Sequence, residues 1–137
     1  MSGRILAVDF GSKRVGIALS DPLRIFAKAH SVIPNEGIGK VCARILAIAT
    51  QHSADLILVG IPYAIDGTNT PKTTETLEFL HTLTTQTTLE VKGWDERYSS
   101  QEAEAELKKM GKTWQESRQM VDAMAAAMIL TSYLEQQ

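Results

Sequence analysis

The sequence contains one cysteine and no long apolar run, and both absences exclude classes of protein. The single cysteine, Cys42, excludes an internal disulfide and a cysteine-rich zinc site. The histidines, His30, His52 and His81, lack the spacing of metal ligands, so we expect structural or surface roles for them. No stretch approaches the ~20 consecutive apolar residues of a membrane span, and no secretory segment precedes the apolar run after Arg4. We therefore expect a cytoplasmic protein without a membrane partner.

The length and charge of the chain allow an enzyme that acts on nucleic acid. With 137 residues it can bury a core without disulfides, and we predict a single domain over residues 1–137. The formal net charge of -2 argues against a protein that coats nucleic acid, because such proteins are usually basic. It does not exclude a nuclease, in which an acidic metal site offsets the basic residues placed around it.

Apolar runs predict three strands in the first part of the chain, at residues 4–9, 15–20 and 25–32. Asp21 and Pro22 open the second turn, with proline where a type I turn favours it. Short connections between consecutive strands indicate an antiparallel meander.

The rest of the chain alternates helices and strands. Apolar spacing predicts strands at 56–59 and 89–94, and helices at 38–49, 72–84, about 99–111, and from 114 to the C-terminus. The order β-β-β-α-β-α-β-α-α predicts an α/β fold with a mixed five-stranded sheet, three antiparallel strands and then strand–helix crossovers, flanked by helices. This is the ribonuclease H-like arrangement.

The same spacing predicts which helical residues face the core. Cys42 lies on the apolar face of the first helix, so we expect a buried thiol rather than a nucleophile. The inner faces of the second and last helices are expected to carry Leu77, Leu80 and Leu83, and Trp114, Val121, Met124, Ala125, Met128 and Ile129.

Four carboxylates stand where such a sheet binds ligands. Asp9 ends the first strand, and Asp95 and Glu96 follow the fifth, so all three can reach one end of the sheet. Asp122 comes one residue after Val121 in the last helix, at the edge of its apolar face. Converging carboxylates cannot all ionise without a cation. These four residues are therefore the candidate catalytic residues.

A metal ion would allow the carboxylates to act together. Asp9, Glu96 and Asp122 are the candidate ligands of Mg²⁺ or Mn²⁺, and whether Asp95 or Glu96 binds the ion stays open. Two such ions about 4 Å apart would activate a water and stabilise the leaving oxygen of a phosphodiester.

Basic residues and glycines surround the first carboxylate. Lys13 and Arg14 lie in the turn after Asp9, and Arg97 follows the second acidic pair, so we expect all three to contact nucleic-acid phosphates. Gly16, on the returning strand, leaves room for a ligand or for another backbone.

Each carboxylate also has a structural alternative. Asp9 is a favoured residue at the start of an ordinary hairpin turn, and Asp95 could cap a turn. Glu96 could pair with Arg97, and Asp122 could lie on a solvated helix edge. Spacing alone leaves these alternatives open.

Four motifs in order add a resemblance that covers essentially the whole chain. They lie at residues 9–16 (DFGSKRVG), 59–68 (VGIPYAIDGT), 95–104 (DERYSSQEAE) and 122–134 (DAMAAAMILTSYL). They resemble the YqgF family, small ribonuclease H-like proteins of bacteria related to the RuvC Holliday junction resolvase.

The resemblance implies a metal-dependent nuclease for structured nucleic acid. The substrate it implies first is the 5′ end of precursor 16S ribosomal RNA, and the alternative is the four-way DNA junction. The family's acidic positions correspond to Asp9, Asp95 with Glu96, and Asp122. One departure from the wider superfamily is Gly60, at the end of the fourth strand, where ribonuclease H and the resolvase have an acid.

Two other classes of function remain. The turn after Asp9 also resembles the phosphate loop of actin-like phosphotransferases, but that fold needs two such domains and a longer chain. A non-catalytic RNA- or ribosome-binding module would keep the same fold.

The oligomeric state, monomer or homodimer, also stays open, although a resolvase that cuts two strands symmetrically would favour a dimer.

Overall fold

The computed structural model describes residues 3–98 and 121–137. Its strands are β1 (Arg4–Phe10), β2 (Arg14–Ser20), β3 (Ala27–Pro34), β4 (Ala54–Ile61) and β5 (Glu90–Asp95). Its helices are α1 (Ile38–Gln51), α2 (Pro71–Thr85), the 3-10 turn η1 (Glu96–Tyr98) and α4 (Val121–Glu135). The helix expected at 99–111 and the start of the last one, including Trp114, lie outside the described residues.

The strands form one mixed sheet in the order β3-β2-β1-β4-β5. β1 is antiparallel to β2 and parallel to β4, and β4 is parallel to β5. The predicted five-stranded topology is therefore confirmed over the described residues. The carboxyl ends of β1, β4 and β5 meet at one edge, where open α/β sheets place their ligand sites.

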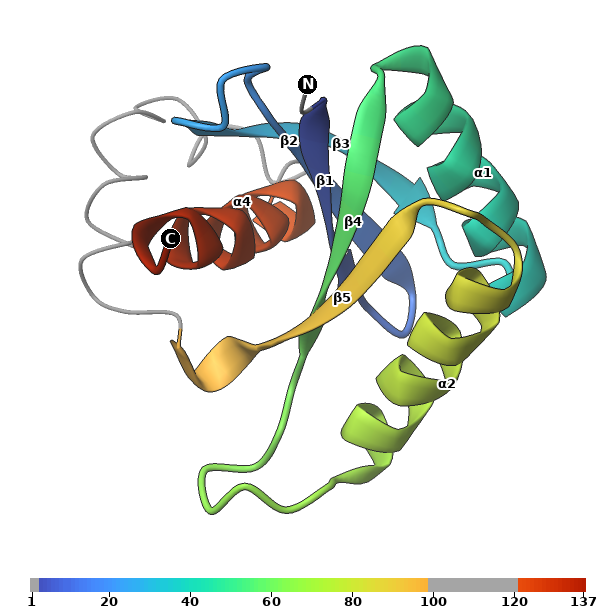
Figure 1. The fold of residues 1–137 in the computed structure, drawn as a ribbon. Coiled ribbons are helices and arrows are strands. Elements are labelled where there is room, and N and C mark those ends of the chain that lie inside the picture. The colour runs from blue at the N-terminus through green and yellow to red at the C-terminus, as the bar shows by residue number, and fades with distance from the viewer. Residues whose placement is uncertain (1–2, 99–120) are drawn as a thin grey trace.

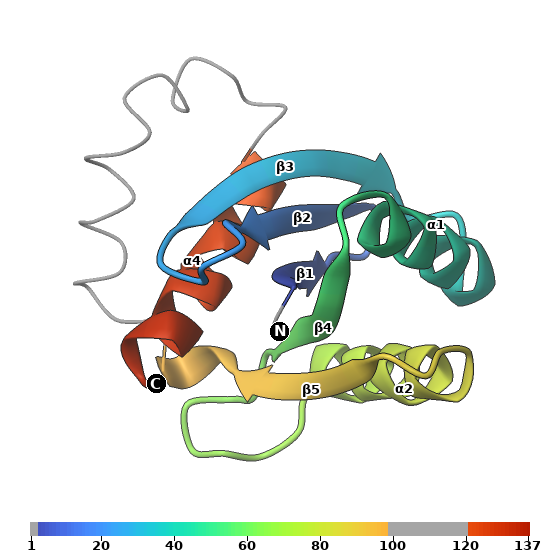
Figure 2. The same ribbon diagram turned by 45° about the horizontal axis from the view of Figure 1, so that its top comes forward.

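The central strand β1 is buried on both faces, because helices cover each side of the sheet (Figures 1 and 2). Leu6 and Val8 pack in one cluster with residues of α1 and α2, whereas Ile5 and Ala7 pack in another with residues of α4. Since strand side chains alternate between faces, Asp9 follows Ile5 and Ala7 onto the side of α4.

Of the predicted inner faces, that of α1 is confirmed, and that of α2 is only partly right. Cys42 is fully buried, and burial raises the pKa of its thiol. In α2, Leu83 is buried, but Leu77 and Leu80 are only partly buried. The fully buried positions of this helix also include Phe79, Thr73 and Thr76.

Hydrogen bonds explain why threonines lie on the inner face of α2. The Thr73 hydroxyl donates to the carbonyl oxygen of Pro62 (2.6 Å), and the Thr76 hydroxyl donates to that of Lys72 (2.9 Å). A satisfied hydroxyl can be buried at little cost. A pattern based on hydropathy treats threonine as polar and therefore missed this face.

The predicted inner face of α4 is only partly right, since Met124 and Ile129 are buried as expected but Ala125 and Met128 are half-buried. Val121 was expected inside, but it is 47% exposed, while Ala123, Ala126 and Ala127 are fully buried. The helix therefore packs on the sheet through small residues, which allow close approach. The sequence pattern placed more weight on the larger apolar side chains. No helix among the described residues is long and apolar enough to cross a membrane.

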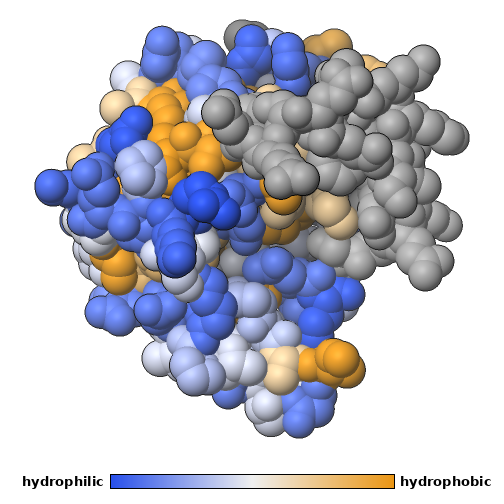
Figure 3. All heavy atoms as spheres, turned by 180° about the vertical axis from the view of Figure 1, so that it is seen from behind, coloured by the Kyte–Doolittle hydropathy of each residue, from blue (hydrophilic) through white to orange (hydrophobic). Residues whose placement is uncertain are grey.

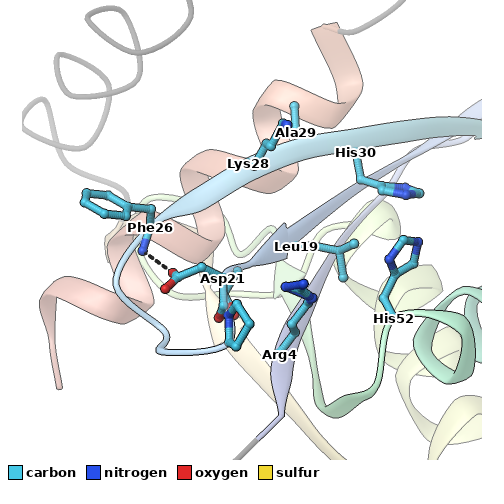
Figure 4. Close-up of a pocket in the computed structure, with 10 residues that line it drawn as sticks. Arg4, Leu19, Asp21, Phe26, Lys28, Ala29, His30 and His52 are labelled. Carbon is cyan, nitrogen blue, oxygen red and sulfur yellow. Dashed lines mark hydrogen bonds between the residues drawn. The ribbon is translucent and has the colours of Figure 1, made fainter.

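The third strand begins later than predicted because Asp21 holds the preceding turn. Its carboxylate accepts hydrogen bonds from the backbone amides of Leu23, Ile25 and Phe26. Figure 4 shows the bond from Phe26. These apolar side chains stay exposed, and β3 begins at Ala27 rather than at residue 25. Seen from behind, the coloured surface is mostly hydrophilic with local hydrophobic patches (Figure 3).

Gly16 allows α4 to touch the sheet with its backbone. A Cβ on Gly16 would lie 1.8 Å from the carbonyl oxygen of Asp122 and 2.8 Å from the amide nitrogen of Ala123. Backbone atoms at such a distance cannot move aside without shifting the helix.

We therefore predict that Gly16→Ala lowers the free energy of unfolding by about 2 kcal/mol or more, because the added methyl group pushes α4 off β2. The measurement is urea unfolding followed by circular dichroism. Gly39→Ala is the matched control: a Cβ at this position of α1 has open space around it, and it should raise stability by roughly 0.5 kcal/mol. Equal stability of the Gly16→Ala variant and the parent would contradict the close contact.

Candidate active site

Asp9 lies near the carboxyl end of β1 and pairs in register with Gly16 of β2. Because the backbone of Asp122 lies directly against Gly16, the first turn of α4 is brought next to Asp9. The sequence left open whether Gly16 makes room for a ligand or for a backbone. The structure shows a backbone there, the backbone that carries the third candidate carboxylate.

Glu96 follows β5 and its side chain lies over Gly60 of β4. A Cβ on Gly60 would stand 3.1 Å from Cγ of Glu96 and 2.4 Å from Cδ1 of Ile129. The fourth strand, which lacks the acid expected from the wider superfamily, thus leaves the space that the Glu96 side chain uses. Glu96 belongs to η1, which follows β5, the strand next to β4 in the sheet.

The carboxylates of Asp9, Glu96 and Asp122 interact electrostatically. Burial, and secondly the charge of Asp122, raises the pKa of Asp9 to about 6. Burial, and secondly the charge of Asp9, raises the pKa of Glu96 to about 7. Desolvation and like charge both disfavour an ionised carboxylate, so the site holds negative charge at a cost.

Asp122 is paired with Arg14, the first residue of β2. Nε of Arg14 donates to Oδ2 of Asp122 at 2.8 Å. Among residues 3–98 and 121–137, no three His, Cys, Asp or Glu side chains lie close enough together to hold one metal ion. Asp122 is paired with Arg14 in this structure, and a metal site formed by Asp9, Glu96 and Asp122 stays a prediction.

Asp95 points elsewhere, although it is adjacent to Glu96. Its carboxylate binds the Arg97 guanidinium, with Nη2 2.6 Å from Oδ2, and this pairing holds the pKa of Asp95 below its usual range. The Arg97 guanidinium also lies 5.6 Å from the Tyr63 ring and donates to the carbonyl oxygen of Ile65. Of the two neighbouring acids, it is Glu96 that interacts with Asp9, and Asp95 rather than Glu96 that pairs with Arg97.

Besides Arg97, the predicted phosphate contacts are Lys13 and Arg14, which lie where the chain turns from β1 into β2. Lys13 and Arg14 are both exposed. The turn is fixed by Asn35, whose side-chain amide donates to the carbonyl oxygen of Gly11 (2.8 Å) and whose backbone amide donates to that of Lys13 (2.9 Å). Arg14 contacts the carboxylate of Asp122, whereas Arg97 pairs with Asp95.

Comparisons with known proteins agree with this architecture. The family model described as "RuvX: Holliday junction resolvase" matches residues 3–136. The chain belongs to the RuvX family. RuvX is another name for the YqgF family predicted from the four motifs, so that prediction is confirmed.

Relatives and solved structures extend the RuvX assignment. A protein of Syntrophomonas wolfei named "Putative pre-16S rRNA nuclease" is 35% identical over 96% of this chain and 94% of its own length. One of Desulforamulus reducens with the same name is 36% identical over 96% of both chains.

Two solved structures show the fold. Thermus thermophilus RuvC in complex with a Holliday junction substrate has a TM-score of 0.65 at 14% identity, covering 98% of this chain and 94% of that chain. The fowlpox virus Holliday junction resolvase has a TM-score of 0.62 at 14% identity, covering 98% and 99%. The predicted ribonuclease H-like fold is confirmed.

Lys72, the second residue of α2 in this RuvX protein, is not among the site residues predicted from the sequence. Its Nζ is buried, has no hydrogen-bond partner among the described residues, and lies 5.3 Å from the centroid of the Phe10 ring. Its positive charge lowers the pKa of both Asp9 and Glu96, against the effect of burial. One signal was available: the first turn of a helix favours acidic side chains, so a lysine there is an exception.

The candidate residues of this RuvX chain do not extend to the other end of the sheet. A hollow of about 610 Å³ lies there, where β1 begins (Figure 4). It is lined by Arg4, Lys28 and the rings of His30 and His52, which pack edge to face with centroids 4.7 Å apart. None of the predicted site residues lines it.

We predict that Asp9→Asn stabilises the RuvX protein at pH 8 in the presence of chelator. A carboxylate with a raised pKa in the folded state makes folding less favourable as pH rises from about 4 to about 7, because the folded protein must give up a proton it retains more strongly than the unfolded chain. At about 1.4 kcal/mol per pKa unit, the gain should be about 3 kcal/mol at pH 8 and should vanish below pH 4.

Asp95→Asn is the control for this prediction, because its folded pKa is lowered. Its pairing with Arg97 stabilises the protein above the unfolded pKa and is lost in acid, so this substitution should lower stability at pH 8. Urea unfolding at both pH values checks the two signs. A less stable Asp9→Asn variant at pH 8 would make Asp9 a structural turn residue.

Proposed function

We propose that this protein is a divalent-metal-dependent endonuclease that hydrolyses phosphodiester bonds at the 5′ end of precursor 16S ribosomal RNA. The observation that carries the proposal is the interaction of three carboxylates from separate elements, Asp9, Glu96 and Asp122, at the carboxyl edge of the parallel strands. Membership of the RuvX family and the names of the relatives support a nuclease. The names of the relatives also favour ribosomal RNA as the substrate.

The donor set suits Mg²⁺ or Mn²⁺. Asp9 and Glu96 offer carboxylate oxygens, which these ions prefer, and Mg²⁺ keeps several waters, so two protein ligands are sufficient to begin a site. Asp122 can join them by leaving Arg14, which then becomes available to the substrate. When bound, the ion supplies an activated water and stabilises the charge that develops on the leaving oxygen.

The surroundings of the carboxylates suit a nucleic-acid strand. Lys13 and Arg14 follow Asp9 closely in the chain and are exposed, so they offer cations for phosphates. Beyond Asp95 and Arg97 lies a hollow of about 520 Å³, lined also by the aromatic rings of Tyr63, Trp94 and Tyr98. Aromatic and guanidinium faces stack on nucleobases without regard to sequence, so this hollow is suited to an unpaired base next to the cut.

The four-way DNA junction is the second candidate substrate. The description of the RuvX family favours it, and the fold is shared with resolvases. A resolvase needs two active sites related by a two-fold axis, so this alternative also requires a homodimer.

We predict that the full chain cleaves precursor 16S ribosomal RNA with Mg²⁺ or Mn²⁺ and that chelator abolishes cleavage. A four-way junction assayed alongside should be cut more slowly. Asp9→Asn and Glu96→Gln should each reduce the rate about 100-fold or more, because they remove charge that supports the reacting centre. Asp95→Asn should retain most of the activity, because Asp95 is engaged by Arg97.

Three outcomes would contradict parts of this proposal. Faster cleavage of the junction would favour the resolvase, and binding of RNA without any cleavage would favour a non-catalytic module. Loss of activity in Asp95→Asn with retention in Glu96→Gln would reverse the assignment of the two adjacent acids.

A further prediction concerns phosphate contacts. Arg14→Ala should weaken binding to RNA and to junction DNA by a similar factor, and should reduce the slope of log affinity against log salt by about 1. Arg97→Ala, measured in the same way, tests whether nucleic acid also binds at the aromatic hollow that Arg97 lines. Arg44→Ala, an exposed position on α1, is the control and should leave the slope unchanged. Binding by Arg14→Ala that matches the parent at every salt concentration would place the substrate elsewhere.

A further inference from the structure

Lys72 is held in place by an anchored helix start. The Thr70 side chain accepts a hydrogen bond from the Thr73 amide, and the Thr73 side chain accepts one from the Thr70 amide, which caps α2 on both sides of Lys72. The Thr73 hydroxyl also donates to Pro62 at the end of β4 (2.6 Å). The backbone of Lys72 is therefore tied to the same sheet edge that carries Asp9 and Glu96.

The ammonium group of Lys72 lies over the ring of Phe10, the residue after Asp9, and lacks hydrogen-bond acceptors among the described residues. Its Nζ is buried against the Phe10 ring and acts on both Asp9 and Glu96, yet neither carboxylate is within hydrogen-bond distance. An ammonium carries three donors, and an aromatic face satisfies its charge only in part. A buried charge without hydrogen-bond partners is costly, so a group that lacks them is expected to meet a ligand that supplies them.

We propose that Lys72 forms a phosphate-binding site with the carboxylate edge of the sheet, in which its ammonium donates to a non-bridging oxygen of the substrate phosphodiester beside Asp9 and Glu96. This inference rests on the proposed function for the identity of the ligand. Lysine binds phosphate as a point charge with freely rotating donors, which suits a group that approaches from a fixed helix start. Lys72 lies against the Phe10 ring, which packs in the cluster with α1 and α2, whereas Asp122 belongs to α4, which packs in the cluster on the other face of the sheet.

The test compares Lys72→Met with a matched lysine. Lys92 also lies over an aromatic ring, with Nζ 5.8 Å from the Tyr133 centroid, but it is exposed and pairs with Glu90. The probe is a single-stranded RNA decamer, and its binding to the full chain is measured by fluorescence anisotropy in chelator over a salt series. Lys72→Met should weaken binding about tenfold or more and reduce the salt slope by about 1, whereas Lys92→Met should change neither.

Two further measurements separate phosphate binding from a structural role. Lys72→Arg should restore most of the binding, because it keeps a cation at the helix start. Thermal unfolding should show that Lys72→Met is folded. Decamer binding by folded Lys72→Met equal to that of the parent would overturn the proposal and make Lys72 a counter-ion of the two carboxylates.

The outcomes also distinguish this inference from the proposed function. If the parent protein fails to cleave RNA but its binding still depends on Lys72, the phosphate site stands and the nuclease assignment fails. If the parent cleaves and Lys72→Met cleaves with the same kcat and KM, the nuclease assignment stands and the phosphate site fails.

Discussion

The backbone contact between Gly16 and the first turn of α4 is the constraint on which the candidate site depends. The contact joins β2, which pairs with β1, to the helix that carries Asp122. It is possible because Gly16 has no side chain. The buried alanines of α4 continue the same close packing along the helix. Because both partners are backbone, the separation of Asp9 and Asp122 is set by steric contact rather than by flexible side chains.

The site concentrates like charge, and the surrounding fold compensates for it with two cations on opposite faces of the sheet. Arg14 pairs with Asp122, and Lys72 acts on Asp9 and Glu96 from the α2 side. A third cation, Arg97, is fully engaged by Asp95. The charges that offset Asp9, Glu96 and Asp122 are therefore distinct from the Asp95–Arg97 pair, which lines the neighbouring aromatic hollow.

The parts of the site that depend on strand ends were predictable from the sequence, and those that depend on side-chain direction were not. Asp9 and Glu96 end strands that the apolar pattern identifies, and topology brings their ends to one edge. The choice between Asp95 and Glu96 depends on which of them Arg97 binds, which spacing does not reveal. Lys72 was missed because a single charged residue at a helix start has an ordinary surface explanation. Val121 was misplaced because small residues, Ala123, Ala126 and Ala127, take part in the packed face of α4 together with larger ones.

The burial of Cys42 has a practical consequence for the study of this protein. Its thiol lies within the core beneath α1, and its raised pKa disfavours the reactive thiolate. A maleimide reagent should therefore not react with the Cys42 thiol in the folded state. One cysteine introduced at a chosen surface position would carry a fluorophore alone, so the path of a bound strand over the molecule could be mapped by energy transfer without removing the natural thiol.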